Sequence, residues 1–390
     1  MTEADAKDKK RETLSWCMYD WAYSAFATIV VSAVLPVYYS QVAASNLEGH
    51  IATAYWGYTT VITLFIAAVL SPVMGAIADY SGMKKRLLMI FAALGIFSTA
   101  LLYFIKTGDW LLASLFFIFG NVGFTVSEVF YNSMLPYVAR PGEMDRVSIK
   151  GYIFGYTGGG ILLAIDIAMI ELMSDKLLAT RLSFLTVSIW WTVFTIPLVL
   201  NVKEPPGGRK GQSGVNPFTA GFKRLAETFR ELRKYRELAL FLAAFWVYND
   251  GIGTIIKMAT IYGAEIGISQ TALIGALLMT QFVGIPFSFA FGRLSGIIGA
   301  KNSILLGLAV YTAISIGGYF MENAVHFWIL AFLVGTVQGG TQALSRSMFG
   351  SMLPKDKTAE FFGFYGMSSK FAGIVGPLVF AVVSQTTGSS

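Results

Sequence analysis

The chain has 390 residues, of which 55% are apolar and only 13% charged, and this composition excludes an ordinary soluble globular protein. Its single cysteine, Cys17, excludes a disulfide framework and a cysteine-based metal site, and we expect neither a metal nor a cofactor. A net charge of +6 would suit a nucleic-acid partner only if the basic residues gathered on one surface.

Long runs without Asp, Glu, Lys or Arg predict helices that cross a membrane, because about twenty apolar residues span its hydrocarbon core. Six runs precede residue 203, at 21–47, 51–78, 87–105, 110–127, 151–165 and 182–202. Five follow residue 236, at 238–249, 269–292, 302–321, 325–345 and 371–390. Several of these helices should continue past the runs, through embedded charges. The sequence therefore predicts an all-α membrane protein.

The basic residues lie almost entirely in alternate connections. The N-terminus, every second loop and the segment 203–236 together hold 23 Lys and Arg, whereas the intervening loops hold three. Because cytoplasmic loops carry the excess of Lys and Arg, this pattern places the N-terminus in the cytoplasm. The positive charge is thus a topology signal, and we expect no nucleic-acid partner.

Segment 203–236 is the only long polar stretch, and it divides the chain into a half of six helices (1–202) and a half with five (237–390). Within it, apolar residues recur every three or four positions and predict an amphipathic helix on the inner membrane surface, beside anionic lipid. These residues are Phe218, Phe222, Leu225, Phe229 and Leu232. A solvated connector whose stripe packs on the protein is the alternative. Five helices in the second half predict that a twelfth lies beyond this chain.

The two halves resemble each other in sequence. Residues 127–136 align with 345–354, matching two serines, Met, Leu and Pro, at an offset of 218. The glycine-containing turn at 75–84 aligns with 292–301 at an offset of 217. Parallel repeats of six helices around a central site are typical of major-facilitator transporters, so we expect two pseudo-symmetric six-helix bundles.

The turn between the second and third helices resembles the major-facilitator signature of Gly, Asp, Gly and a basic cluster. Its glycines permit close helix contact and a tight turn. Its aspartate can hold a neighbouring helix through bonds that break when the halves move, so we interpret the motif as a conformational latch. An ordinary basic cytoplasmic loop is the alternative. The latch residues are Gly75, Asp79, Gly82, Lys84, Lys85 and Arg86.

Five further motifs, at 19–26, 130–132, 248–251, 338–347 and 360–365, resemble a narrower group across nearly the whole chain. They are similar to the "unknown major facilitator" family of bacteria, which is related to the autophagy-linked vacuolar amino-acid effluxers of fungi. Tyr23 departs from that pattern, where Asn is expected. The resemblance implies a twelve-helix transporter of a bacterial inner membrane and, from the fungal relatives, export of amino acids such as leucine and tyrosine.

Polar residues inside the apolar runs indicate the site, because a charge in the membrane usually faces a cavity or a partner. Gln338, Gln342 and Arg346 share one face of the tenth helix, and Glu128, Tyr131 and Asn132 one face of the fourth. By the repeat, Glu128 and Arg346 are equivalent. We expect Arg346 to bind a substrate carboxylate, and Glu128 to bind an ammonium group or carry a proton. A fixed ion pair between them is the alternative.

Further candidates lie in other helices. Asp20 and Asp250 could carry protons, although Asp20 would also suit a helix end near the cytoplasmic surface. Asp250, Asn249 and Lys370 are expected to contribute to substrate binding, with a structural ion pair as the alternative for Lys370.

No phosphate-binding loop of the type G-x-x-x-x-G-K-[ST] occurs, so the sequence does not support ATP-driven pumping or an enzyme. We expect a monomeric secondary or facilitative transporter of small solutes, with amino acids or similar zwitterions as substrates. Protons are a candidate coupling ion, and facilitated diffusion, symport and antiport all stay open. The alternatives are a proton-driven exporter of drugs or metabolites and a non-transporting sensor or scaffold on the same fold.

Overall fold

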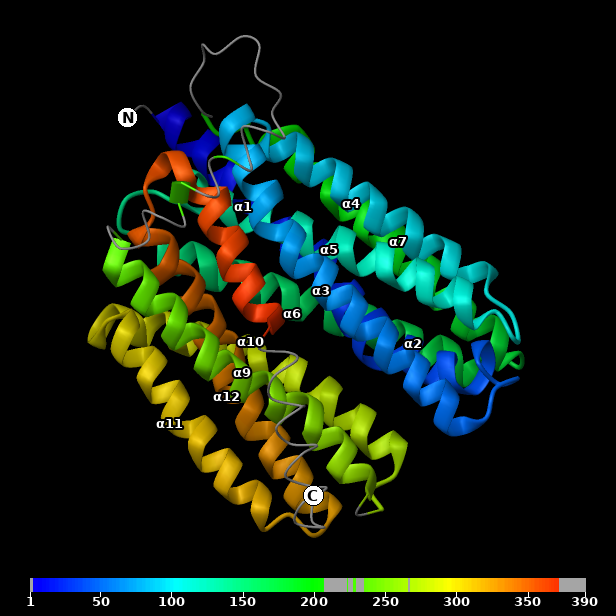
Figure 1. The fold of residues 1–390 in the computed structure, drawn as a ribbon. Helices are drawn as coiled ribbons and strands as arrows, with labels where there is room; N and C mark the ends of the chain where they lie inside the picture. Colours follow the sequence, from blue (N-terminus) through cyan, green and yellow to red (C-terminus); the bar gives the residue numbers. More distant parts are fainter. Residues whose placement is uncertain (1–2, 207–222, 224–226, 229–234, 266, 372–390) are drawn as a thin grey trace.

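The computed structural model describes residues 3–206, 223, 227–228, 235–265 and 267–371 (Figure 1). Ten helices in these ranges are long and apolar enough to cross a membrane, which confirms the prediction of an all-α membrane protein. The predicted linker stripe of Phe218, Phe222, Leu225, Phe229 and Leu232 lies outside the described residues, as does the last apolar run beyond residue 371.

The first half contains the six expected spans. The first span is α1 (Glu3–Ala25) continued by η1 (Phe26–Val34), α2 (Leu35–Tyr38) and η2 (Tyr39–Ala43). It is followed by α3 (Gly49–Ser81), α4 (Lys84–Leu101) with η3 (Leu102–Phe104), α5 (Trp110–Val138), α6 (Met144–Leu172) and α7 (Lys176–Asn201).

The described part of the second half contains α9 (Arg236–Glu265), α10 (Gln270–Ile298), α11 (Ala300–Tyr319) and α12 (Ala324–Met352), then η5 (Lys355–Lys357). A further helix follows over 358–371. As expected, several helices run past the charge-free stretches. For example, α5 contains Glu128 and α12 contains Arg346.

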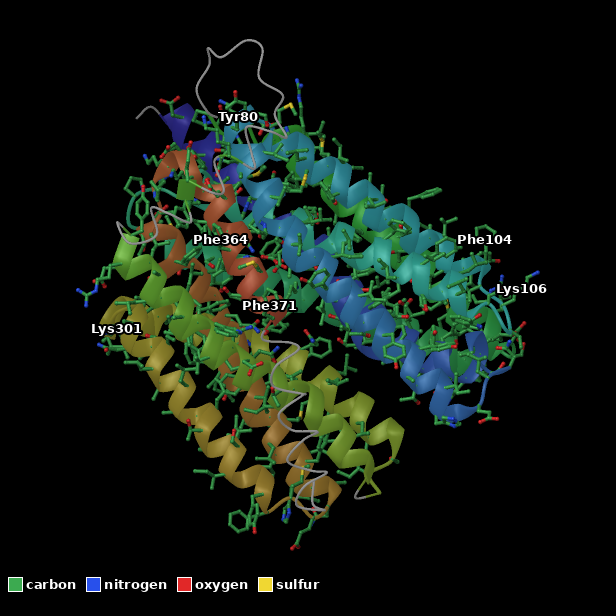
Figure 2. The ribbon with its side chains drawn as sticks, in the orientation of Figure 1. Tyr80, Phe104, Lys106, Lys301, Phe364 and Phe371 are labelled. Carbon is green, nitrogen blue, oxygen red and sulfur yellow. The ribbon has the colours of Figure 1, made fainter. Side chains whose placement is uncertain are left out.

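Large apolar side chains cover the outside of the helices. Phe97 and Phe104 on one face of the first half are 64% and 63% exposed, and Ile189 on α7 is 63% exposed. Figure 2 shows Phe104 and Lys106 at the opposite end of the first half from Tyr80. Soluble proteins rarely expose so much apolar surface, and lipid is the environment that such a surface requires.

Glycines on α6 bring it into close contact with α1. A Cβ at Gly158 would lie 2.5 Å from the Trp21 carbonyl oxygen, and one at Gly155 would lie 2.6 Å from Ser24 Oγ. Small residues let membrane helices approach until their backbones touch, and this packing replaces the hydrophobic driving force that lipid does not supply. The α1–α6 contact thereby fixes the position of the polar residues that the two helices carry.

The two halves meet at the end of the molecule that carries the N-terminus, and their helices diverge from there (Figure 1). The side chain of Tyr156 on α6 fits against Gly284 of α10 and Gly339 of α12. Nearer the N-terminal end, Gly292 of α10 faces Ile149 of α6. These contacts join the halves beneath the space described next.

Candidate functional site

A central cavity of about 990 Å³ lies between the halves. The first half contributes residues of α1, η1, α5 and α6 to its wall, and the second half contributes residues of α9 to α12. Its lining extends from Asp20 to Glu322, just beyond the end of α11. Such a volume suits a small organic solute, since ligand sites typically measure roughly 300–1,000 Å³.

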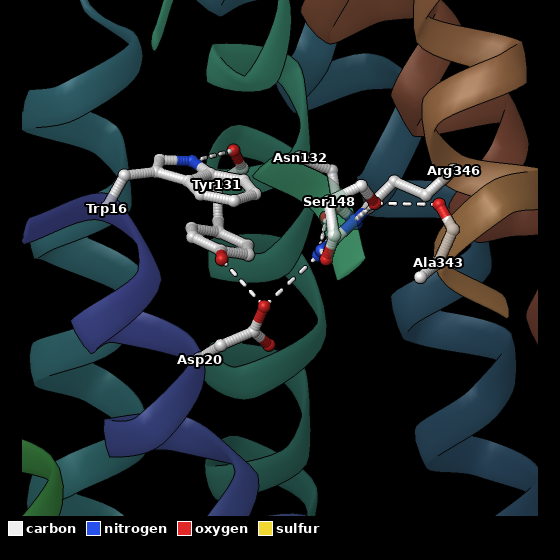
Figure 3. Close-up of polar contacts among 7 residues, drawn as sticks. All are labelled: Trp16, Asp20, Tyr131, Asn132, Ser148, Ala343 and Arg346. Atoms are coloured by element: carbon white, nitrogen blue, oxygen red, sulfur yellow. Dashed lines mark hydrogen bonds and ion pairs between the residues drawn. The ribbon is translucent and has the colours of Figure 1, made fainter. Parts of the chain in front are cut away.

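Arg346 lies at the end of the cavity where the halves touch, and only 2% of it is exposed. Its Nε and Nη2 donate hydrogen bonds to Ser148 Oγ at 2.8 Å and to the Ser148 carbonyl oxygen at 2.7 Å. Its Nη1 donates to Asn132 Oδ1 at 3.1 Å and forms an ion pair with Asp20 at 3.3 Å (Figure 3). We call Arg346, Asp20, Asn132 and Ser148 the Arg346 cluster. It ties α12 of the second half to α1, α5 and α6 of the first.

Aromatic side chains position Asp20 and the guanidinium. The Tyr131 hydroxyl donates a hydrogen bond to Asp20 Oδ2 at 2.7 Å (Figure 3). Tyr131 stacks on Trp16 at 4.2 Å, and Trp16 Nε1 donates to the Tyr131 carbonyl oxygen at 3.0 Å. The guanidinium carbon also lies 4.5 Å from the centre of the Tyr152 ring. A desolvated guanidinium is attracted to such rings, so the cluster is held on several sides.

Gly151 is the residue of α6 that gives the ion pair its space. A Cβ at this position would lie 2.5 Å from Asp20 Oδ2 and 2.9 Å from Arg346 Nη2. Neither Gly151 nor Ser148 was identified from the sequence. Gly151 is the first residue of the predicted run 151–165, where a glycine otherwise indicates only helix packing. Ser148 lies before that run, in the basic connection that precedes it.

The other candidates divide into two groups. Glu128, Gln338 and Gln342 line the central cavity together with Asp20. Tyr131 and Asn132 belong to the surroundings of Arg346 and are outside the lining. The structure pairs Arg346 with Asp20, and it shows no ion pair for Glu128 among the described residues.

The remaining candidates are set back from the cavity surface. Lys370 Nζ lies 6.0 Å from the centre of the Phe124 ring, which is part of the lining, and it acts electrostatically on Glu128. Asn249 and Asp250 are half-buried on α9 and are outside the lining. Over the described ranges, no group of three or more His, Cys, Asp or Glu side chains is placed to hold a metal ion.

The turn after α3 makes a second contact between the halves. Asp79 Oδ1 forms a buried ion pair with Lys84 Nζ at 2.8 Å, and Oδ2 accepts a hydrogen bond from the backbone N–H of Glu360 at 2.8 Å. Gly75 allows this approach, because a Cβ there would overlap the Ala359 carbonyl. Gly82 ends α3 in the left-handed conformation, with φ of 67°. The aspartate thus joins α3 to the start of the helix over 358–371.

The rest of the basic cluster bonds within the first half. Lys85 Nζ donates to the carbonyl oxygens of Val199 and Val202, both at 2.7 Å. The Glu204 carboxylate accepts from the backbone N–H groups of Lys85 at 2.8 Å and Arg86 at 3.3 Å. These bonds attach the end of α7 to the start of α4. The contact between the halves at this turn therefore centres on Asp79.

Comparisons with known proteins place this geometry among transporters. A family model described as vacuole effluxer Atg22-like matches residues 8–144 and 139–390. The MFS-type transporter YxiO of Bacillus subtilis is 43% identical, over 96% of this chain and 89% of the relative. Autophagy-related protein 22-1 of Aspergillus niger is 23% identical, over 97% of this chain and 84% of the relative.

Solved structures share the fold at low sequence identity. The proton:xylose symporter XylE, of the major facilitator superfamily, superposes with a TM-score of 0.69 at 11% identity, over 98% of this chain and 90% of that one. A bacterial homologue of the iron transporter ferroportin in an outward-facing state gives 0.67 at 12% identity, over 97% and 93%. The expectation of a major-facilitator fold is confirmed.

Proposed function

Because the chain belongs to the Atg22-like vacuole effluxer family and has the major-facilitator fold, we propose that it moves a small solute across a membrane by alternating access of its two halves. The observation that carries this proposal is the buried ion pair of Asp20 and Arg346, which joins the halves at one end of the central cavity. A buried contact of this kind closes one side and must break before that side can open.

We propose that the end carrying the N-terminus faces the cytoplasm of a bacterial cell. The distribution of Lys and Arg along the chain supports this orientation. The Arg346 cluster and the Asp79 contact would then close the cytoplasmic side, and the central cavity would be accessible from outside. Movement of the halves about the cavity would break both contacts.

We propose amino acids or similar small zwitterions as substrates. The volume of the cavity is adequate for them, and its lining combines apolar walls with the carboxamides of Gln338 and Gln342 and the carboxylate of Glu128. The description of the family as effluxers favours export. Asn249, Asp250 and Lys370, set back from the lining here, would contribute only after the helices of the second half move.

Proton coupling is proposed through Asp20 and Glu128, with Asp250 as a third candidate. Protonation of Asp20 would remove the charge that faces Arg346 and leave Asn132 and Ser148 as neutral partners of the guanidinium. Charge-assisted hydrogen bonds are roughly twice as strong as neutral ones, so the closed contact would weaken. Proton binding and opening of the cytoplasmic side would thereby be linked.

The test is flux of a labelled amino-acid mixture in proteoliposomes, measured in both directions with and without a pH gradient. We expect flux that increases with the gradient and that Asp20→Asn and Glu128→Gln each reduce by about tenfold or more. Glu171→Gln is the matched control, because Glu171 is exposed at the outer end of α6 and pairs only loosely with Lys176, at 3.8 Å.

Three outcomes differ in meaning. Flux that ignores the gradient and survives Asp20→Asn would reject proton coupling through that residue and favour facilitated diffusion. Flux of drugs or other metabolites in place of amino acids would support the exporter alternative. Absence of flux for every solute tried, with folded protein in the liposomes, would reject transport and favour a sensor or scaffold.

A further inference from the structure

The charged side chains in the described lining of the central cavity are all acidic. Among the lining residues that the structure describes, they are Asp20, Glu128 and Glu322, and this described lining includes no Lys, Arg or His. The nearby cations lie behind this surface. Arg346 is covered by Tyr152, and Lys370, which is outside the lining, lies over the ring of Phe124 and attracts Glu128. A solute entering the cavity therefore meets carboxylates first.

Arg346 is not available to a solute in this state. Its guanidinium donates four hydrogen bonds to protein atoms, on Ser148, Asn132 and Asp20, and 98% of the residue is covered. A solute carboxylate could reach it only by displacing Asp20. Replacing the Asp20 carboxylate by a solute carboxylate would gain little binding free energy, because the guanidinium already has an anionic partner.

Glu128 is the carboxylate with capacity for a ligand. Among the described residues its carboxylate forms no ion pair, its polar neighbours are Asn132 and the more distant Lys370, and it is half-buried beside the cavity. Tyr23 and Tyr152, both in the lining, lie within electrostatic range of Glu128 and of Asp20. Tyr23 also packs against Phe124, with ring centres 5.1 Å apart. Carboxylates and aromatic faces both attract cations, so together they form a site for a positive group.

We propose that the central cavity selects its solute by a protonated amino group, held by Glu128 with Asp20 against the rings of Tyr23 and Tyr152, and that a solute carboxylate is not required. Gln338 and Gln342 on the opposite wall can donate or accept, so they accommodate either end of a zwitterion or a neutral group. This inference rests on the proposed transport function and narrows its substrates to ammonium-bearing solutes.

The test compares three ligands with one carbon skeleton, by calorimetric titration of the purified full chain in detergent. Leucine is a zwitterion, leucinamide is a cation, and 4-methylpentanoate lacks the amino group. We expect leucinamide to bind about as tightly as leucine and 4-methylpentanoate to bind at least about tenfold more weakly, because a site built for a polar group rejects the analogue that lacks it. Glu128→Gln should weaken leucinamide about tenfold or more, and Glu171→Gln should leave it unchanged.

Tight binding of 4-methylpentanoate, or failure of leucinamide to bind at millimolar concentration, would overturn the inference. The wild-type series decides this even where Glu128→Gln does not fold. Binding and transport are measured in separate assays, so failure of the selectivity proposal can be distinguished from failure of the transport proposal. Binding of leucinamide without its transport into proteoliposomes would support the selectivity proposal and contradict the transport proposal.

Discussion

Replacing Arg346 by lysine tests whether the Arg346 cluster holds the halves together. The substitution keeps the charge and removes the branched donor geometry, so it separates the guanidinium contacts from simple ion pairing. Arginine reaches Ser148 through Nε and Nη2, and Asn132 and Asp20 through Nη1. A lysine ammonium has one nitrogen and cannot occupy these three positions at once.

The structure gives the size of the expected effect. Of the four hydrogen bonds, we expect lysine to keep at most two, and hydrogen bonds to charged groups contribute about 1.5–3 kcal/mol each. The loss of two therefore weakens the closed contact by at least about 3 kcal/mol. Because about 1.4 kcal/mol is a factor of ten, the ratio of closed to open molecules should fall by roughly a hundredfold.

Spin-label distances report this ratio. Arg86 and Lys301 are exposed and lie in the first turns of α4 and α11, in different halves. Each can be replaced by a labelled cysteine, in a Cys17→Ser background. We expect Arg346→Lys to add a population with a longer distance between the labels. Arg293→Lys is the control, because Arg293 is exposed and stacks on Phe289 of its own helix. Equal distance distributions for Arg346→Lys and the wild type would refute the role of the cluster.

Two further substitutions follow from the same contacts. Gly151→Ala should destabilise the closed state by about 1–3 kcal/mol through overpacking against Asp20, whereas Gly57→Ala, with nothing within 4 Å of its Cβ, should leave the spin-label distances unchanged. Asp79→Asn leaves the buried ammonium of Lys84 without its anion, which costs about 3–5 kcal/mol of stability. This variant should have a lower melting temperature and longer spin-label distances than the wild type. An unchanged melting temperature would contradict this prediction.

The sequence predicts the helices well for a physical reason. In lipid, every backbone polar group must be bonded within the segment, so a long apolar run has essentially one structure available. All six runs of the first half correspond to spans in the structure. The predicted run 110–127 stops before Glu128, whereas α5 continues to Val138. A charge that faces a cavity does not end a helix.

The pairing of side chains was less accessible to sequence reasoning. Helical spacing indicates which residues share a face, but it does not give the rotation of one helix relative to another. Asp20 and Arg346 are 326 positions apart and belong to different halves. The repeat predicts that Glu128 and Arg346 face each other across the cavity or both line it, with an ion pair between them as the alternative. Equivalent positions in two related halves both face the axis between them, and this does not require them to touch.

Asp20 belongs both to the Arg346 cluster and to the lining of the central cavity, and this double membership connects binding with movement. A proton or an ammonium group that reaches Asp20 competes with Arg346 for the same carboxylate. A ligand shifts an equilibrium between two states only by binding one of them better, and the effect is reciprocal. A cation at Asp20 gains most where Arg346 has moved away, so cation binding in the cavity favours opening of the contact beneath it. The reverse also holds, and we infer that closure of the Arg346 cluster weakens the hold of the cavity on its solute.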